Sequence, residues 1–207
     1  EASFWLGVFF VLFPLNFFVY SLNDYGDIEA DAKNIRKGNF IFGAKSDKPT
    51  LKKAVLWSSI ILIGFAVYFV VLSQSWLIFL LFASIALINY VYNFAPFRVK
   101  SRPPFELLIQ VGYLLTAVFS SLWNGVDIIS WQAFVYLSFF CFQAHLAGEI
   151  MDIDPDLQSG KTTTAVLIGR KRAKWLMVAL LGIEVYILGH WFNDWVLASV
   201  LAGFMLW

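Results

Sequence analysis

The sequence predicts an all-α membrane protein, a polytopic bundle of helices that cross the bilayer several times. Of its 207 residues, 60% are hydrophobic and only 14% are charged, whereas about a quarter of the residues in a soluble domain are charged. Apolar runs long enough to span the hydrocarbon core, about 20 residues, recur along the chain. Runs of this length are helical in lipid, where every backbone polar group must be satisfied internally.

The apolar runs divide the chain into successive spans. Six complete spans are expected, at 2–22, 54–73, 76–95, 105–123, 131–149 and 173–192, and a seventh begins near residue 195. Apolar sequence begins almost at once, without a basic leader, and the last run stops partway. We therefore interpret residues 1–207 as a single transmembrane domain, a fragment trimmed at both ends.

The basic residues predict the orientation in the membrane. Short connections without Lys or Arg alternate with connections that together hold all fifteen basic residues. The basic connections are 23–53, 96–104 and 150–174. Because cytoplasmic loops carry the excess of Lys and Arg, these three connections are expected on the cytoplasmic side. The sequence thus predicts a multi-pass protein of the cell membrane.

A cluster of acids follows the first span in the stretch "NDYGDIEAD". Asp24, Asp27 and Asp31 stand at positions i, i+3 and i+7, so a helix would place them on one narrow stripe. Asn23 lies one turn before Asp27 and joins this stripe. Like charges at this spacing repel, so we expect a positive group among them.

A second cluster, "GEIMDIDPD", repeats the same spacing at the end of the fifth span. Carboxylates together with phosphate oxygens are typical ligands of Mg²⁺, and two such stripes at the cytoplasmic ends of spans predict a magnesium site there. One such cluster alone is as typical of a helix cap or a solvated interface. The predicted metal ligands are Asp24, Asp27, Asp31, Glu149, Asp152 and Asp156.

Basic residues close to the acids predict that the site holds phosphate as well as metal. Arg and Lys are the usual phosphate ligands, although basic loops also need them as membrane anchors. The predicted diphosphate ligands are Lys33, Arg36, Lys100, Arg102 and Lys161. A site for Mg²⁺ and phosphate at a membrane surface suggests a diphosphate whose tail lies in the lipid.

Loss of diphosphate from an allylic carbon leaves a carbocation, which aromatic faces stabilise through the cation–π effect. The stretch "NYVYNFAP" brings tyrosines to the cytoplasmic end of the third span. The residues predicted to act in catalysis are Asn23, Asp27, Asp152, Tyr90, Tyr92 and Asn93. Cys141, His145 and His190 are isolated in the sequence and receive no catalytic role.

These motifs resemble those of the UbiA superfamily of intramembrane prenyltransferases. "NDYGDIEAD" fits the family's NDxxDxxxD motif, and "DIDPDLQSGKTTTAVLIG" is similar to its second motif. "YNFAPFRVK" looks like the segment between them, and "NIRKGNFIFGA" resembles the lycopene elongase or carotenoid-type branch. The Arg-Pro pair common in quinone-pathway members is missing from 32–50, where "DKPT" is the nearest stretch.

The resemblance implies a bundle of nine helices, of which this chain would cover about seven. It implies Mg²⁺-dependent transfer of a prenyl group from an isoprenyl diphosphate to a lipophilic acceptor, such as a carotenoid or a quinone precursor. Asp24, Asp27, Asp31, Asp152 and Asp156 would hold Mg²⁺ on the diphosphate. The residues alone leave three alternatives: a CDP-alcohol phosphotransferase-like enzyme, a divalent-cation transporter, and a membrane scaffold without chemistry, which would leave the paired stripes unexplained.

Overall fold

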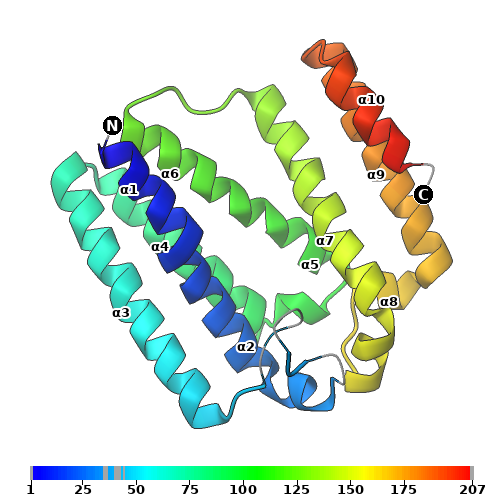
Figure 1. Cartoon of the computed structure of the whole chain (residues 1–207), viewed down its shortest axis with the longest axis horizontal. Coiled ribbons are helices and arrows are strands. Elements are labelled where there is room, and N and C mark those ends of the chain that lie inside the picture. Colours follow the sequence, from blue (N-terminus) through cyan, green and yellow to red (C-terminus); the bar gives the residue numbers. More distant parts are fainter. Residues whose placement is uncertain (1, 35–36, 40–42, 44, 206–207) are drawn as a thin grey trace. The chain divides into compact units, whose positions relative to one another are not determined.

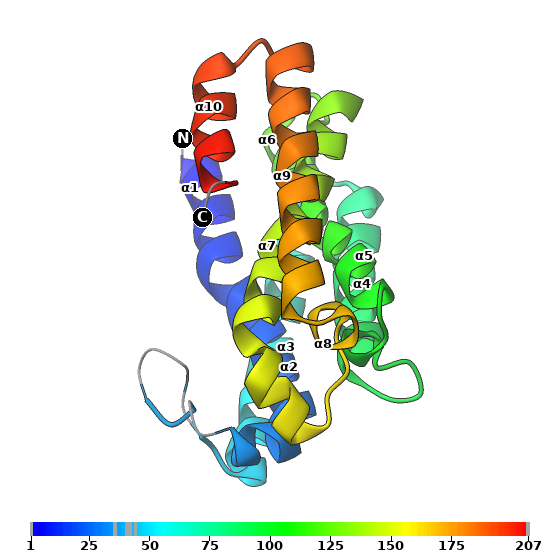
Figure 2. The ribbon, with the colours of Figure 1, turned by 90° about the vertical axis from the view of Figure 1, so that its right-hand side faces the viewer.

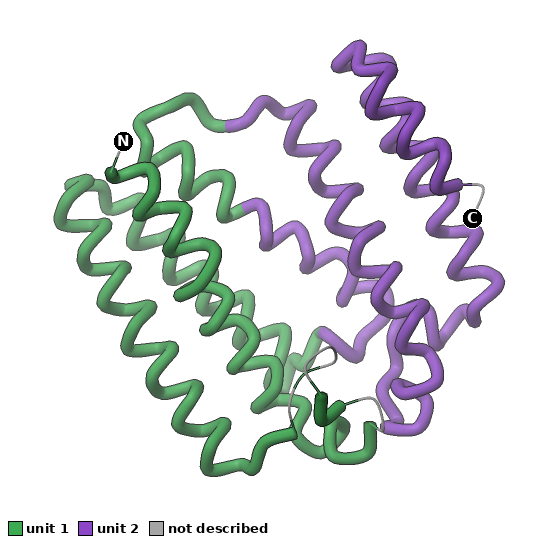
Figure 3. The backbone as a smooth tube through the Cα atoms, viewed as in Figure 1, with its two compact units in different colours: residues 1–99, 115–128 green, residues 100–114, 129–207 purple. Residues whose placement is uncertain are grey.

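The computed structural model describes residues 2–34, 37–39, 43 and 45–205. These residues are mainly helical, and their one β-type pairing is an isolated bridge between Asn39 and Gly43. The chain divides into two compact units, shown in Figure 3. Unit 1 comprises Glu1–Val99 and Leu115–Ile128, and unit 2 comprises Lys100–Leu114 and Ile129–Trp207. Whether the chain forms a single domain stays a prediction.

The helices of unit 1 begin with one continuous run (Figure 1). They are α1 (Ala2–Phe10), the π-helical turn η1 (Val11–Leu15), α2 (Asn16–Lys33), α3 (Lys48–Ser73), α4 (Trp76–Asn93) and α6 (Leu115–Asn124). The π-helical turn contains Pro14, which cannot donate a backbone hydrogen bond. The side chain of Asn16 supplies donors to this turn, because its Nδ2 donates to the carbonyls of Val11 and Leu12, at 3.0 and 3.1 Å.

Aromatic rings form the core of unit 1. Phe10, Phe69, Phe82 and Phe119 contact one another with ring centroids 4.9 to 6.1 Å apart, and at most 4% of each is exposed. Tilted and edge-to-face pairs of this kind stabilise a core beyond the area that they bury. This cluster packs the first helical run against α3, α4 and α6.

Unit 2 is built around two long antiparallel helices. Its elements are α5 (Phe105–Leu108), the 3-10 turn η3 (Ile109–Leu114), α7 (Trp131–Ser159), α8 (Thr164–Ile168), α9 (Arg170–Trp191) and α10 (Trp195–Phe204), and the 3-10 turn η2 (Val99–Ser101) leads into it. Trp131 contacts Trp191 at one end of the α7–α9 pair, and Asp154 pairs with Arg170 at the other. Figure 2 shows α10 returning alongside α9.

The predicted spans are confirmed by six helices that are long and apolar enough to cross a membrane. These are Ala2–Lys33, Lys48–Ser73, Trp76–Asn93, Phe105–Asn124, Trp131–Ser159 and Arg170–Trp191, and Trp195–Phe204 is a shorter apolar helix. Two of them continue beyond the predicted apolar spans, and α7 passes through Pro155 without ending. Both acidic motifs therefore lie on helices, which makes the predicted stripes real features of α2 and α7.

Candidate functional site

The first acidic stripe lies near the C-terminal end of α2 in unit 1. Asp24, Asp27 and Asp31 are all half-buried, and so is Asn23, whereas the off-stripe Glu29 is exposed. A cavity of about 210 Å³ opens beside the stripe, between α2 and the start of α3. It is lined by Asp24, Ile28, Asp31, Ala32, Lys45, Ser46 and Leu51. Two of the three stripe carboxylates thus face a cavity.

Lys37 supplies the positive group expected among these acids. Its Nζ lies 3.1 Å from Oδ1 of Asp24 and 2.9 Å from Oδ2 of Asp31. Burial alone would lower the pKa of Lys37, but the two carboxylates outweigh it and raise the pKa above its ordinary value of 10.5. Lys37 is therefore a cation at neutral pH, and it bridges two members of the stripe.

Sequence reasoning assigned the phosphate contacts of this loop to the neighbours of Lys37. Of these, Lys33 is exposed at the end of α2, and Arg36 lies outside the described residues. The signal that could have singled out Lys37 is its place just past the third acid of the stripe. Lys37 follows the end of α2 at Lys33 by four residues, and its backbone N–H donates to the carbonyl of Asn34 at 3.3 Å.

The segment after α4 also reaches the first stripe. Nη2 of Arg98 lies 3.7 Å from Oδ1 of Asp27, and the ring of Phe94 contacts Tyr25 of α2 at 6.2 Å. Arg98 has a φ of 42°, a left-handed backbone that is uncommon outside glycine. Within unit 1, this segment therefore lies at the same end as the acids, as the positive-inside prediction requires.

The predicted cation-stabilising residues lie at the end of α4. Tyr90 is 48% exposed and its ring contacts Phe94 at 5.6 Å, and Tyr92 is half-buried. Asn93 is only 2% exposed, and its Nδ2 donates to the carbonyl of Asn89 at 3.0 Å. Tyr90 thus presents an accessible ring, whereas the side chain of Asn93 is engaged with the turn of helix that precedes it.

The second acidic stripe lies on the last turns of α7 in unit 2. Asp156 is 8% exposed, and Asp152 is half-buried. Nζ of Lys161 lies 3.7 Å from Oδ1 of Asp156, and its backbone N–H donates to the carbonyl of the same residue at 2.9 Å. Gly160 between them has a φ of 76°, which favours glycine at the end of the helix. The predicted phosphate ligand Lys161 is thus held beside a predicted metal ligand.

Glu149, the third member of this stripe, contacts the backbone of α8. It is 5% exposed, and its Oε2 accepts from the N–H of Ala165 at 3.0 Å. Its Oε1 lies 3.4 Å from Nε2 of His145, which also lies 3.3 Å from Nε2 of Gln110. His145, which is isolated in the sequence, thus has two neighbours in the fold: Glu149, one turn along α7, and Gln110 of η3, which is 35 residues away in sequence.

Sequence reasoning missed Glu106 in α5. This residue is 0% exposed, and its Oε1 accepts from both the N–H of Thr164, at 2.6 Å, and the hydroxyl of the same residue. Glu106 also lies within electrostatic range of Glu149. Its only sequence signal is an acid in an otherwise apolar run just after a basic loop, and that pattern does not reveal the partner at Thr164.

The remaining predicted phosphate ligands precede α5. Lys100 in η2 is only 1% exposed, and Arg102 is exposed. A lysine is almost never fully buried unless it is paired, so its burial marks Lys100 as a residue with a fixed position. Arg102, in contrast, retains access to solvent or to a headgroup. Their predicted contacts with phosphate are still predictions.

The donors in unit 1 fit Mg²⁺. This ion usually binds through one or two carboxylates plus substrate phosphate, and Asp24 and Asp31 line a single cavity. Among the described residues, no group of three His, Cys, Asp or Glu side chains is arranged to hold a metal ion by itself. The predicted meeting of the two stripes involves one stripe from each unit, and it stays a prediction.

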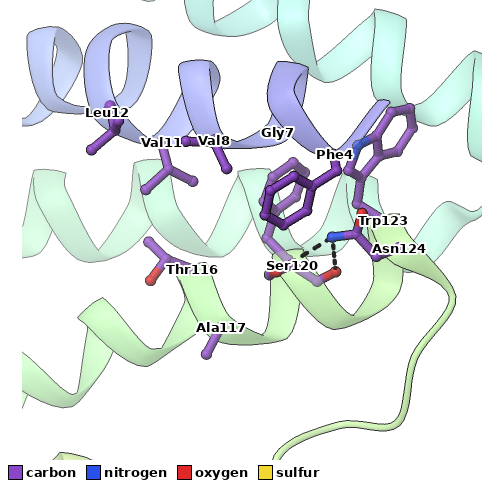
Figure 4. Close-up of a pocket in the computed structure, with 11 residues that line it drawn as sticks. Phe4, Gly7, Val8, Val11, Leu12, Thr116, Ala117, Ser120, Trp123 and Asn124 are labelled. Carbon is purple, nitrogen blue, oxygen red and sulfur yellow. Dashed lines mark hydrogen bonds between the residues drawn. The ribbon is translucent and has the colours of Figure 1, made fainter. Parts of the chain in front are cut away.

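A second cavity in unit 1, of about 260 Å³, lies between α1 and α6 (Figure 4). Phe4, Val8 and Leu12 line one side, and Thr116 and Ala117 the other. At about 1.5 Å per residue, Leu12 is roughly 20 Å along the helical run from Asp27. The lining contains no ionisable side chain, so this cavity suits hydrocarbon and is separate from the acidic stripe.

Comparison with known proteins identifies the family. The sequence model of the UbiA prenyltransferase family matches residues 1–207, the whole chain. The chain belongs to this family. The resemblance read from the two aspartate motifs is thereby confirmed, as is the all-α membrane bundle typical of the UbiA family. Together with its six apolar helices, this makes the chain a multi-pass membrane protein. No solved structure matches it.

Curated relatives of the chain are consistent with the carotenoid-type branch. The chain is 29% identical over 185 residues to the lycopene elongase/hydratase of Corynebacterium glutamicum. This alignment covers 86% of the chain and 62% of that protein. It is 25% identical to the C(50) beta-cyclic carotenoids biosynthesis protein LbtBC of Dietzia sp., covering 88% of the chain and 43% of that protein. It is also 25% identical to the lycopene elongase/hydratase of Haloferax volcanii, in an alignment that covers 92% of the chain and 57% of that protein. The chain thus spans from two fifths to three fifths of these relatives.

Proposed function

We propose that this protein transfers a prenyl group from an isoprenyl diphosphate to a lipophilic acceptor within the membrane and releases diphosphate. The observation that carries the proposal is the stripe of Asp24, Asp27 and Asp31, which borders a cavity and is contacted by two basic side chains. Membership of the UbiA prenyltransferase family supports this reaction over phosphotransfer or cation transport. The names of the relatives favour a carotenoid, such as lycopene, as the acceptor.

The proposed reaction breaks the bond between the allylic carbon and the diphosphate oxygen, and the electron pair leaves with diphosphate. A double bond of the acceptor then attacks the allylic cation, which forms a carbon–carbon bond, and the acceptor afterwards loses a proton. Mg²⁺, when bound, would neutralise the charge that develops on the leaving group. The five aspartates of the two motifs, Asp24, Asp27, Asp31, Asp152 and Asp156, are the proposed ligands of this ion.

The chain's own cations would share the task of holding the diphosphate. Lys161 is held beside Asp156, and Arg98 lies beside Asp27, so each cation is already close to a proposed metal ligand. Cations aimed at a leaving group stabilise the charge that forms in the transition state. Lys33, Arg36, Lys100 and Arg102 are further proposed phosphate ligands.

The allylic cation needs neighbours that are rich in electrons but weakly nucleophilic. The exposed ring of Tyr90, at the same end of unit 1 as the acids, can supply a π face to it. Tyr92 and Asn93 are the other proposed contacts. A water-poor site at this end would let the acceptor double bond attack before water does.

The decisive experiment is prenyl transfer in membranes. The full chain is incubated with lycopene and labelled geranylgeranyl, farnesyl or dimethylallyl diphosphate, and the lipid products and released diphosphate are measured. We expect a labelled, elongated lipid that forms only with Mg²⁺. Asp27→Ala and Asp152→Ala should each abolish it, whereas Glu29→Ala, an exposed acid off the stripe, should not. Full activity in either aspartate variant would refute the assignment.

A further inference from the structure

Two buried glutamates tie the start of α8 to two other elements of unit 2. Glu106 of α5 accepts from the N–H and the hydroxyl of Thr164, and Glu149 of α7 accepts from the N–H of Ala165. The first N–H groups of a helix have no partner within the helix. Here carboxylates that are at most 5% exposed take two such groups in succession.

This arrangement is costly for a fold to maintain. Within the described part of the chain, Oε2 of Glu106 and Oε1 of Glu149 are buried without a hydrogen-bond partner. Glu149 also lies within electrostatic range of Glu106 and of Asp156. Burying carboxylates that are only partly satisfied is unfavourable. A neutral side chain could also accept from the hydroxyl and N–H of Thr164 and from the N–H of Ala165, so capping alone does not require these charges.

The segment that these glutamates fix carries Lys161. It begins at Asp156, whose carbonyl accepts from the N–H of Lys161, and it ends at Thr164. Thr163 caps α8 with its own hydroxyl, which accepts from the N–H of Val166 at 3.4 Å. The turn is thus anchored at both ends, and Lys161 lies between the anchors with its ammonium group 3.7 Å from Asp156.

We propose that Glu106 is a positioning residue, which holds Thr164 so that Lys161 and Asp156 keep the mutual placement needed to bind a diphosphate. The inference rests on the proposed function and adds to it a residue in neither aspartate motif. Glu106 would act through the segment from Asp156 to Thr164 and would not itself touch the substrate. Gln110 supports it, because its Nε2 donates to the backbone carbonyl of Glu106 at 2.8 Å.

The test compares Glu106→Gln with Asp154→Asn, which alters an exposed acid of the same unit that pairs with Arg170 at the surface. Glu106→Gln keeps the shape and an acceptor oxygen but loses the charge. We expect its KM for the isoprenyl diphosphate to rise about tenfold, the factor that one charged hydrogen bond is typically worth. Asp154→Asn should leave KM unchanged.

A double-variant cycle with Lys161→Ala separates positioning from general destabilisation. If Glu106 acts through Lys161, then adding Glu106→Gln to Lys161→Ala should raise KM no further. A merely structural role would lower the folded fraction, and so the apparent kcat, while KM stayed constant. An unchanged KM in Glu106→Gln, or effects on KM that multiply in the double variant, would overturn the inference.

Thr164 gives a second route if Glu106→Gln folds poorly. Thr164→Val removes the hydroxyl at constant volume and should raise KM, whereas Thr164→Ser keeps the hydroxyl and should not.

Stabilisation of the full chain by inorganic diphosphate with Mg²⁺ provides a readout without turnover, and Glu106→Gln should reduce this stabilisation. A wild type that is stabilised by diphosphate but transfers no prenyl group would contradict the proposed function alone. A Glu106→Gln variant stabilised as strongly as the wild type would contradict the positioning role alone.

Discussion

The two units treat their polar side chains differently. In the described part of unit 1 the buried polar side chains are uncharged, Ser21, Ser58, Asn93 and Ser121, and the acids lie half-buried beside a cavity. Unit 2 instead buries charged side chains, Lys100, Glu106, Glu149, Asp156 and Glu184. Stripes with the same spacing are therefore placed in different surroundings, one beside a cavity and the other against the backbone of α8.

This difference shows that spacing on a helix does not by itself fix the role of a carboxylate. Asp24 is the first member of its stripe, and it faces a cavity and a lysine side chain. Glu149 is the first member of the other stripe, and it accepts from a backbone N–H. An acid that pairs with a mobile side chain can exchange that partner for a ligand, whereas an acid that holds the backbone cannot do so without disturbing the fold.

The largest expected effect comes from changing one aspartate in each stripe. Asp31→Asn in unit 1 and Asp156→Asn in unit 2 should each lower prenyl transfer by about 10²–10³-fold, the usual loss when one electrostatic contact to a transition state is removed. If both stripes act on one diphosphate, the double variant should lose far less than the product of the two losses, because groups that act as a unit are not additive. Transfer rates at saturating Mg²⁺ measure this.

The control for this pair is Asp154→Asn, which removes an exposed acid that lies off the second stripe. It should retain the wild-type rate. Losses that multiply fully in the double variant would show that the two stripes act independently, and they would contradict a shared diphosphate.

The next effect concerns Glu184, the most isolated of the buried acids in unit 2. It lies in α9 with 0% exposure, and neither carboxylate oxygen has a hydrogen-bond partner among the described residues. An unpartnered buried polar group costs about 1–3 kcal/mol, so Glu184→Met, which keeps the length of the side chain, should raise the free energy of unfolding by that amount. Thermal or denaturant unfolding in detergent micelles measures it.

Unit 1 provides the matched comparison for Glu184. Hydroxyl oxygens of Ser21 and Ser58 lie 2.7 Å apart and join α2 to α3, so Ser58→Ala should lower the free energy of unfolding by about 0.6 kcal/mol, the average for such bonds in membranes. The two variants should therefore shift stability in opposite directions. A Glu184→Met variant that is less stable than the wild type would show that this carboxyl has a partner that stabilises it.

Most of the fold could be predicted because apolar length and the alternation of basic loops are properties of the sequence itself. The stripes were predictable for the same reason, since Asp24, Asp27 and Asp31 lie within two turns of one helix. The partners of the buried side chains in unit 2 could not be predicted. Thr164 is 58 residues from Glu106, and Gln110 is 35 residues from His145, so these contacts depend on how α5, η3, α7 and α8 pack, which no local pattern encodes.

Another small expected effect sharpens the contrast in unit 1, where Lys37 bridges Asp24 and Asp31. Its side chain is 18% exposed and those of the two acids 39% and 22%, so the pairs are partly screened and Lys37→Met should cost only about 1 kcal/mol of stability without Mg²⁺. Lys33→Met, at the exposed end of α2, is the matched control and should cost little. If Mg²⁺ binds both carboxylates as proposed, Lys37 would compete with it, and removal of Lys37 should also lower the Mg²⁺ concentration that gives half-maximal transfer. A higher Mg²⁺ requirement would instead assign Lys37 to substrate binding.

The same lysine predicts a pH dependence whose sign follows from its pKa. The paired carboxylates raise the pKa of Lys37 above 10.5 in the folded chain, against the opposing effect of burial. Its contribution to stability is therefore fully present below pH 10.5 and is lost as the pH rises through the raised folded value. The wild type should lose stability more steeply than Lys37→Met over that alkaline interval, and the two curves should run parallel at neutral pH. If stability fell equally steeply with pH in the wild type and in Lys37→Met above pH 10.5, the ammonium group of Lys37 would gain nothing from the acids. Another cation would then be needed to offset the repulsion among the three aspartates of the unit 1 stripe.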